Sequence, residues 1–226
     1  MEEMDKCFWT VVELLTKNKI TWWLEAGSLL GAVRDGGRIK WDDDYDIGFP
    51  RKDSFRVFCA LKKLPPEYSF FGGFGYSVID RNTQEHYICV KPHSCIKGDM
   101  YKLQGTVYIL FRRVIAKIRG GGPYEIFTKI HINKENDEEL VGRKKSLYKK
   151  LIQHLYPLMI FVSIFFYTRL RYRAKCLAYS SFISVKFDDG YAVIPSGYKE
   201  ILIEHYGDYM KPAKKGEYVD LTGKNK

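Results

Sequence analysis

The sequence predicts an α+β fold, and three observations support this class. Apolar residues make up 46% of the 226 residues, which is enough to build a core without disulfide staples. Segments with helical spacing of apolar residues are interleaved with short runs of β-branched and aromatic residues. No internal repeat is visible, which argues against a solenoid.

The N-terminal part predicts a helix and then a strand-turn-helix unit. Apolar residues Phe8, Val11, Val12 and Leu15 share one helical face, with charged residues between them, so the start is expected to be a helix and not a secretory signal. A small Gly-Ser pair then separates a β-rich run from a short helix. The expected elements are a helix over about Glu2–Lys17, a strand Ile20–Glu25, a helix Leu29–Arg34 and a strand Tyr45–Phe49.

A third helix is predicted to begin after Phe49. Asp53 or Ser54 would cap it, and it would run to about Leu64 with Phe55, Phe58 and Leu61 facing inward. Pro65-Pro66 would stop it.

The remaining chain predicts short strands, a long helical segment and a final hairpin-helix unit. Asp188-Asp189-Gly190 is typical of a hairpin turn, and Ser196 would cap the last helix. Residues 1–211 are expected to form one domain, with a polar tail at 212–226. Further strands are expected near Tyr68–Phe71, Tyr76–Ile79, Tyr87–Val90, Val107–Phe111 and Tyr124–Ile130, and helix from about Glu138 onward.

Charge is distributed unevenly between the two halves of the chain. Residues 1–100 have a balance of −1 and residues 101–226 a balance of +11. A basic half favours an anionic partner such as phosphate, nucleic acid or a membrane surface, although a single lysine is usually a solubilising group.

The five cysteines are odd in number and contain no C-x-x-C motif, so they imply no disulfide framework and leave the cellular compartment open.

An apolar stretch within the basic helical segment 138–175 is a candidate for membrane contact. Residues 151–168 contain no charged side chain, and lysines and arginines flank both ends. We expect a helix lying at a membrane interface through 151–173. A buried core helix is the next alternative and a true span the least favoured.

The segment from Trp22 to Phe49 carries the chemistry. Gly27-Ser28 follows a strand and opens a helix, where free backbone N–H groups can hold a phosphate. Asp44 and Asp46 are two apart on a predicted strand, so their carboxylates share one face. Such a pair suits Mg²⁺ with substrate phosphate; the alternative is a solvated acidic loop. The flanking apolar residues favour the metal pair, since idle charges on a core strand are costly.

These residues resemble the signature of the LicD/fukutin family. The family pattern is an aromatic-L-x-G-[GST]-L-L-G-A-x-R stretch followed by I-P-W-D-x-D-x-D. Here the corresponding stretches are W-L-E-A-G-S-L-L-G-A-V-R at 23–34 and I-K-W-D-D-D-Y-D at 39–46, with Lys40 in place of the usual Pro. A second similarity lies in I-P-S-G-Y at 194–198 and Y-G-D-Y-M at 206–210, where Tyr206–Met210 is expected to shape an acceptor site or to end a helix, with Asp208 the plausible contact.

The resemblance implies a nucleotidyltransferase-like mixed sheet flanked by helices, and transfer of a substituted phosphate from a CDP-activated donor to a hydroxyl of a glycan or glycolipid. Mg²⁺ or Mn²⁺ would be the cofactor and a CDP-alcohol the co-substrate, and CMP would leave. By this resemblance Asp44 and Asp46 would bind the metal, with Asp42 completing the triad. Gly27 and Ser28 would lie at the donor phosphate.

Two further roles come from the same resemblance. Arg34 matches the motif arginine, which would contact donor phosphate through its planar fork. Glu125 is the best match to a third carboxylate, with Asp99 as the alternative. Either Glu125 or Asp42 would accept the proton of the attacking hydroxyl.

Other interpretations remain open at this stage. His86, Cys89, His93 and Cys95 have spacings that suit zinc, but a regular strand would point the first two to opposite faces.

A nucleotidyltransferase acting on RNA and a non-catalytic membrane-binding module are the rival functions. We expect no nucleic-acid partner, because the basic clusters adjoin an apolar helix and not a groove with aromatic side chains that could stack on bases. The expected location is membrane-associated: the cytoplasmic side for a bacterial protein, or the Golgi lumen for an animal one.

Overall fold

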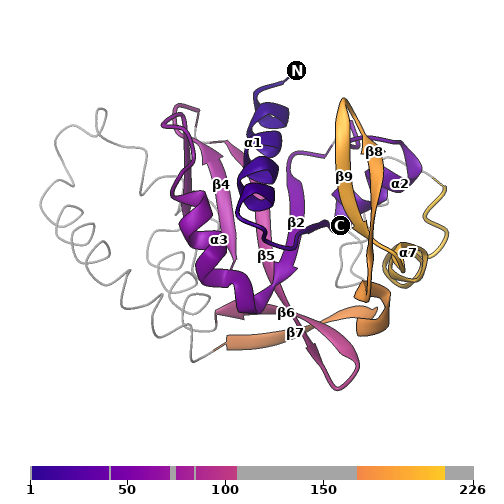
Figure 1. Cartoon of the computed structure of the whole chain (residues 1–226). Coiled ribbons are helices and arrows are strands. Elements are labelled where there is room, and N and C mark those ends of the chain that lie inside the picture. Colours follow the sequence, from indigo (N-terminus) through magenta and orange to yellow (C-terminus); the bar gives the residue numbers. More distant parts are fainter. Residues whose placement is uncertain (1, 41, 72–74, 84, 106–166, 212–226) are drawn as a thin grey trace, which may run out of the picture.

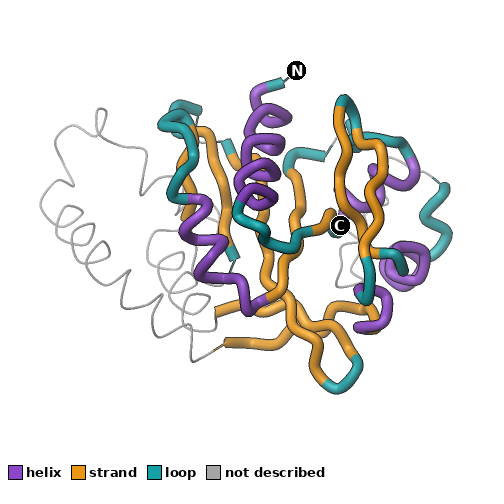
Figure 2. The backbone as a smooth tube through the Cα atoms, viewed as in Figure 1, coloured by secondary structure: helices purple, strands orange, loops and turns teal. Residues whose placement is uncertain are grey.

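The fold is α+β, as predicted, with a curled mixed sheet and helices on its faces (Figures 1 and 2). The computed structural model describes residues 2–40, 42–71, 75–83, 85–105 and 167–211. Expected elements at Val107–Phe111, at Tyr124–Ile130 and from Glu138 to residue 166 lie outside these residues, as do Glu125 and the tail.

The main sheet has the strand order β1-β2-β5-β4-β3, and β2 and β5 are its one parallel pair among the described strands. At the far end of β5, the chain turns back into β6, which pairs with β7. The strands are β1 (Trp23–Leu24), β2 (Tyr45–Pro50), β3 (Tyr68–Phe71), β4 (Tyr76–Asp80), β5 (His86–Ile96), β6 (Asp99–Gly105) and β7 (Tyr167–Lys175).

Helix α1 (Glu3–Lys17) confirms the predicted N-terminal helix and covers one face of the sheet together with α3 (Ser54–Leu61), as Figure 1 shows. Its predicted apolar face, with Cys7 added, is fully or almost fully buried. Phe8 stacks on Tyr45 of β2 with ring centroids 4.2 Å apart. This packing fixes which face of β2 points into the core.

Helix α3 is shorter than expected and turned differently. It ends at Leu61, and its buried residues are Val57, Ala60 and Leu61. The expectation for Phe55 was wrong, because its side chain is 75% exposed. A stripe at i, i+3 and i+4 starting from Val57 buries the small Ala60 in the core and leaves Phe55 outside it.

Helix α2 (Ala26–Arg34) begins three residues before the expected start, so Gly27 and Ser28 lie in its first turn and not ahead of it. Ala26 takes a left-handed φ of 47°, which bends the chain sharply from β1 into the helix. The predicted strand Ile20–Glu25 is reduced to the two residues of β1.

The C-terminal part contributes the hairpin of β8 (Phe182–Phe187) and β9 (Gly190–Pro195), followed by α7 (Tyr198–Tyr206). The predicted turn is confirmed, and Asp188 also accepts hydrogen bonds from the Arg38 backbone N–H at 3.0 and 3.2 Å. The hairpin thereby holds the loop that follows α2. Ser196 was wrongly expected to cap the last helix: Gly197 occupies that position, and Ser196 Oγ accepts a hydrogen bond from Ser181 Oγ at 2.8 Å.

Residues 167–175 form strand β7, which corrects the expectation of helix up to residue 175. Pairing with β6 gives this arginine-rich segment a partner for its backbone groups. The candidate interface segment 151–166 lies outside the described residues. Within the described ranges, no helix combines the length and the apolar character that a membrane crossing requires.

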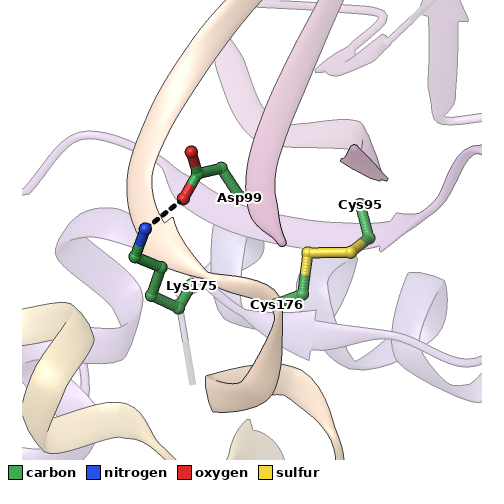
Figure 3. Close-up of a disulfide and its surroundings, with 4 residues drawn as sticks. All are labelled: Cys95, Asp99, Lys175 and Cys176. Carbon is green, nitrogen blue, oxygen red and sulfur yellow. Dashed lines mark hydrogen bonds and ion pairs between the residues drawn. A yellow bond between two sulfur atoms is a disulfide. The ribbon is translucent and has the colours of Figure 1, made fainter. Parts of the chain in front are cut away.

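A disulfide joins Cys95, near the end of β5, to Cys176, which begins the 3-10 turn η2 (Cys176–Tyr179) (Figure 3). The two Cα atoms are 5.7 Å apart and 81 positions apart in sequence. Beside the disulfide, Lys175 Nζ lies 2.6 Å from Asp99 Oδ1. The number and spacing of the cysteines did not predict this pairing. It depends on the fold, which brings the end of β5 close to the residue that follows β7.

Replacing Cys95 and Cys176 by serine should lower the free energy of unfolding by about 4 kcal/mol, the entropy of closing a loop of this length in the unfolded chain. Urea unfolding without reductant, followed by circular dichroism, measures the change. Cys59→Ser, at an exposed free cysteine, is the matched control and should change stability by less than about 0.5 kcal/mol. A double-serine protein as stable as the wild type would contradict the prediction.

Candidate active site at the start of β2

Asp46, the predicted site residue within β2, lies on the face of the strand that is turned away from α1, and Asp44 directly precedes the strand. Tyr45, Ile47 and Phe49 alternate into the core and are at most 1% exposed. Tyr45 is fixed at both ends, since its ring stacks on Phe8 and its hydroxyl donates a 2.8 Å hydrogen bond to Asp5. Because side chains alternate along a strand, Asp46 is directed to the opposite face.

The first turn of α2 is joined to β2 through the backbone of Asp46. The Glu25 N–H donates to the Asp46 carbonyl at 3.0 Å, and the Asp46 N–H donates to Ser28 Oγ at 2.8 Å. Ser28 is 2% exposed, so its hydroxyl positions the strand against the helix. The N–H groups of the first turn remain without a carbonyl partner inside the helix, as at every helix start.

Gly27 is the point of closest approach between α2 and the aspartates. The Asp42 carboxylate lies against Gly27 in the space that a Cβ atom would occupy. A glycine is therefore required for Asp42 to reach the helix start.

Three consecutive carboxylates gather ahead of β2. One oxygen from each of Asp42, Asp43 and Asp44 lies within 4.8 Å of the other two. Burial, together with the negative charges of Asp46 and neighbouring aspartates, raises the pKa of Asp42 to about 6 and that of Asp44 to about 7. A hard divalent cation would relieve this repulsion, and carboxylate oxygens are the ligands it prefers.

Asp46 has a different partner. Lys91 of β5 contacts its Oδ1, and the same Nζ lies 3.5 Å from Glu25 Oε1. The other oxygen of Glu25 is 2.9 Å from Nε2 of His93. Burial alone would lower the pKa of Lys91, but the negative charges led by Asp46 raise it well above the ordinary value. Lys91 is therefore a permanent cation between two carboxylates.

Lys91 and Glu25 were not predicted as site residues. The predicted strand Tyr87–Val90 ended six residues before the end of β5 at Ile96, so Lys91 fell outside the alternation that would have directed it to the face of Asp46. Glu25 was part of the motif, but its place at the end of a predicted strand did not indicate burial. The sharp turn into α2 leaves Glu25 only 1% exposed. A charged residue inside an otherwise apolar run was the available signal.

The structure places the other predicted site residues away from this cluster or outside its description. Arg34 ends α2, and its guanidinium donates two hydrogen bonds to Asp35, at 2.7 and 2.8 Å. Asp99 begins β6, beyond the end of β5 and about 20 Å along that strand from Cys89. Glu125 lies outside the described residues, so its role stays a prediction.

The zinc interpretation changes in the structure. Cys95 is in the disulfide and His93 contacts Glu25, so the four predicted ligands do not meet. However, the expectation that His86 and Cys89 face opposite ways was wrong: Cys89 Sγ lies 3.5 Å from His86 Nε2. The register of β4 and β5 shifts between Val78 and Ile79, which leaves one extra residue in β5 and turns His86 onto the face of Cys89.

The second motif lies at the end of helix α7. Burial raises the pKa of Tyr206, and the negative charges of Asp46 and Asp42 add to the shift. Asp208, the predicted contact of this motif, pairs with Lys211 on the surface at 2.6 Å. Of the two residues, the tyrosine is therefore the one whose pKa responds to the aspartates of the site.

Comparison with known proteins confirms the resemblance found in the sequence. Residues 19–106 match the family model of the LicD/FKTN/FKRP nucleotidyltransferase domain. An uncharacterised protein of Rickettsia prowazekii is 47% identical over 60 residues, which is 26% of this chain and 21% of that protein. The ribitol 5-phosphate transferases FKRP of mouse and human are 49% identical over 43 residues, which is 19% of this chain and 9% of theirs. The chain thus aligns with 21% or less of the length of these relatives, and the matches support phosphotransferase chemistry in general terms.

Lys91→Met should destabilise the protein by about 3 kcal/mol, because it leaves the Asp46 and Glu25 carboxylates without their cation in a site with little solvent. Urea unfolding at neutral pH and without divalent ions measures the loss. Lys175→Met removes an ion pair from a side chain that is 71% exposed and should cost less than about 1 kcal/mol. Equal losses in the two variants would contradict the burial argument.

Asp44→Asn should stabilise the metal-free protein at pH 8 by about 1–2 kcal/mol and have little effect near pH 4, allowing for solvent screening of a side chain that is 26% exposed. The folded-state pKa of Asp44, about 7, lies above the unfolded value of 3.8. Below pH 3.8, Asp44 is protonated in both the folded and the unfolded state and costs the folded protein nothing. As the pH rises towards and through 7, ionisation of Asp44 increasingly disfavours the folded state.

Thermal or urea unfolding in EDTA across this pH range tests the prediction. Asp189→Asn, at an exposed aspartate of the hairpin turn, is the control and should change stability equally little at both pH values. A pH-independent effect of Asp44→Asn would show that this carboxylate is not strained by its neighbours.

Proposed function

We propose that the chain transfers a substituted phosphate from a CDP-activated donor to a hydroxyl of a glycan or glycolipid, with Mg²⁺ or Mn²⁺ as cofactor. The observation that carries the proposal is the gathering of the Asp42, Asp43 and Asp44 carboxylates against the first turn of α2. An acidic cluster that holds a cation, beside N–H groups that hold phosphate, is the minimum that phosphoryl transfer requires.

The residues present fit a hard divalent cation. Two of the clustered carboxylates have raised pKa values because they are buried beside like charges, which is the strain that such a cation relieves. Asp44 would hold it, with Asp46 contributing the oxygen that Lys91 does not contact. Asp43 is an additional ligand that the motif alone did not indicate. When bound, the cation would neutralise charge on the transferring phosphoryl group.

Donor phosphate would bind where α2 begins. The first-turn N–H groups there have no carbonyl partner within the helix, and the Asp42 carboxylate lies against Gly27 of the same turn, so a phosphate held at the helix start would lie beside the aspartates. Lys91 adds a fixed positive charge on the strand next to β2. Arg34, matched to the motif arginine, would have to exchange Asp35 for phosphate to act on the donor.

Asp42 is suited to accept the proton of the attacking hydroxyl. Its pKa of about 6 lies close to the pH at which such an enzyme works, so the carboxylate is ionised and yet basic. In the transfer, the acceptor oxygen bonds to the phosphorus that carries the alcohol substituent. The bond from that phosphorus to the oxygen of CMP breaks, CMP keeps the electron pair, and the hydroxyl proton moves to Asp42. Glu125 remains the alternative base from the resemblance.

The mouse and human relatives are ribitol 5-phosphate transferases, so ribitol 5-phosphate is the first group to test, with phosphocholine the second. Contact with a membrane surface through residues 151–173 would bring a glycolipid acceptor to the site, and it too stays a proposal. Of this segment, the structure describes the part that pairs as β7.

Release of CMP from CDP-ribitol and CDP-choline, with and without Mg²⁺, tests the function on the purified chain. We expect Mg²⁺-dependent release from at least one donor in the presence of a glycan or glycolipid acceptor. Asp44→Asn and Asp46→Asn should each reduce it roughly 100-fold or more while circular dichroism stays native. Asp189→Asn, at an exposed residue of the hairpin turn, should retain the wild-type rate.

Retained turnover in the purified Asp44→Asn or Asp46→Asn protein would refute the metal role. A parallel reaction with a nucleoside triphosphate and an RNA primer covers the rival activity. Nucleotide addition to RNA without CMP release from either donor would replace the proposed function.

A further inference from the structure

Asp44, His86 and Cys89 form a second cluster of metal-binding side chains, here named the mixed-donor cluster. Each offers one ligand atom, and the three atoms lie within 4.8 Å of one another. The cluster shares only Asp44 with the three consecutive carboxylates. Neither the family resemblance nor the proposed transfer assigns a role to His86 or Cys89.

The three side chains are close enough for one small ion to bridge them after a change of side-chain rotamer. At present the imidazole of His86 lies between its partners, with Nδ1 3.6 Å from Asp44 Oδ2 and Nε2 3.5 Å from Cys89 Sγ. Ligand atoms around a tetrahedral zinc ion are about 3.3–3.6 Å apart, given the usual zinc–nitrogen, zinc–oxygen and zinc–sulfur bond lengths. One ion binds only one of the two ring nitrogens, so the imidazole has to turn about its side-chain bonds to enclose an ion together with Asp44 and Cys89, whose ligand atoms lie within 4.8 Å.

Two features of the sheet bring these side chains together. The parallel pairing of β2 with β5 places Asp46 opposite Cys89, so the residues at the start of β2 lie beside this part of β5. The extra residue in β5 then directs His86 to the face that carries Cys89. Tyr87 and Ile88, on the two sides of the shift, are both buried in the core.

The donor atoms select the kind of metal. A thiolate and an imidazole prefer zinc and similar transition metals, whereas Mg²⁺ requires oxygen ligands and retains water. The surroundings are also acidic, because Asp44 belongs at the same time to the three consecutive carboxylates of Asp42, Asp43 and Asp44. The side chains of His86 and Asp44 are 32% and 26% exposed, so an ion has access from solvent.

The other cysteines and histidines near this face have different partners. Cys95 is oxidised with Cys176, and His93 contacts Glu25. Cys89 lies outside the disulfide and has intermediate exposure. Three protein ligands with one position left open is the arrangement typical of zinc sites that bind an exchangeable ligand.

We propose that Asp44, His86 and Cys89 bind one Zn²⁺ ion, with the fourth position open to water or to an oxygen of a ligand. This site is separate from the hard-cation site of the proposed function and shares one carboxylate with it. Its existence does not depend on the transfer reaction.

Cobalt titration of the full chain tests the proposal, because Co²⁺ enters zinc sites and its bond to a thiolate gives a charge-transfer absorption. The protein is first treated with chelator, and reductant is left out to preserve the disulfide. We expect one equivalent of Co²⁺ to produce the thiolate absorption. Stoichiometric Zn²⁺ should abolish this band, and a millimolar excess of Mg²⁺ should not.

Matched variants assign the ligands. Cys89→Ser should remove the thiolate band, and His86→Gln should weaken Zn²⁺ binding by about 100-fold, since even the loss of an outer-shell partner costs 10–100-fold. Cys59→Ser removes the exposed free cysteine of α3 and should leave the band and the affinity unchanged. Circular dichroism of the metal-free variants confirms that each one folds.

Three results would overturn the proposal. One is the absence of a thiolate band in the wild type, which would indicate binding to carboxylates alone. The second is a band that persists in a folded Cys89→Ser protein and disappears in Cys59→Ser. The third is an affinity for Zn²⁺ that His86→Gln does not change.

Discussion

The parallel pairing of β2 with β5 is the constraint on which the site depends. It sets Asp46 opposite Cys89 and Gly48 opposite Lys91, so the aspartates of one strand face the cation and the soft ligands of the other. Tyr45 prevents a one-residue slip, because its ring and hydroxyl are both held by α1. A slip would turn the carboxylates into the core and the aromatic ring into the site. Packing on one face of the sheet thus determines the chemistry on the other.

Some of the carboxylates at the site have a compensating positive charge and others do not. Lys91 compensates Asp46 and Glu25, whereas Asp42, Asp43 and Asp44 have between them fewer positive groups than negative ones. A folded protein tolerates such repulsion at a cost in stability. The cost is consistent with a place prepared for a cation that arrives with the substrate, in contrast to Lys91, which is always present.

Local pattern was sufficient to predict much of this arrangement. The helical spacing of Phe8, Val11 and Leu15 predicted α1, and alternation around Tyr45 predicted β2 with its aspartates. The aspartate motif was recognisable because its residues are consecutive in sequence. The failures involved distant partners: the disulfide, the contact of Lys91 with Asp46, and the meeting of His86 with Cys89. The last depends on a register shift between two strands, which neither strand shows by itself.

The disulfide between Cys95 and Cys176 also bears on how far the length of the chain between the two cysteines can change. It ties both ends of a long stretch of chain to the rim of the sheet, where β5 ends and η2 begins. Whatever lies between these anchors can be lengthened, shortened or exchanged with only a slow rise in the entropy of loop closure. The aspartate-bearing strand β2 lies outside this loop, so its pairing with β5 does not depend on the length of chain that the disulfide closes.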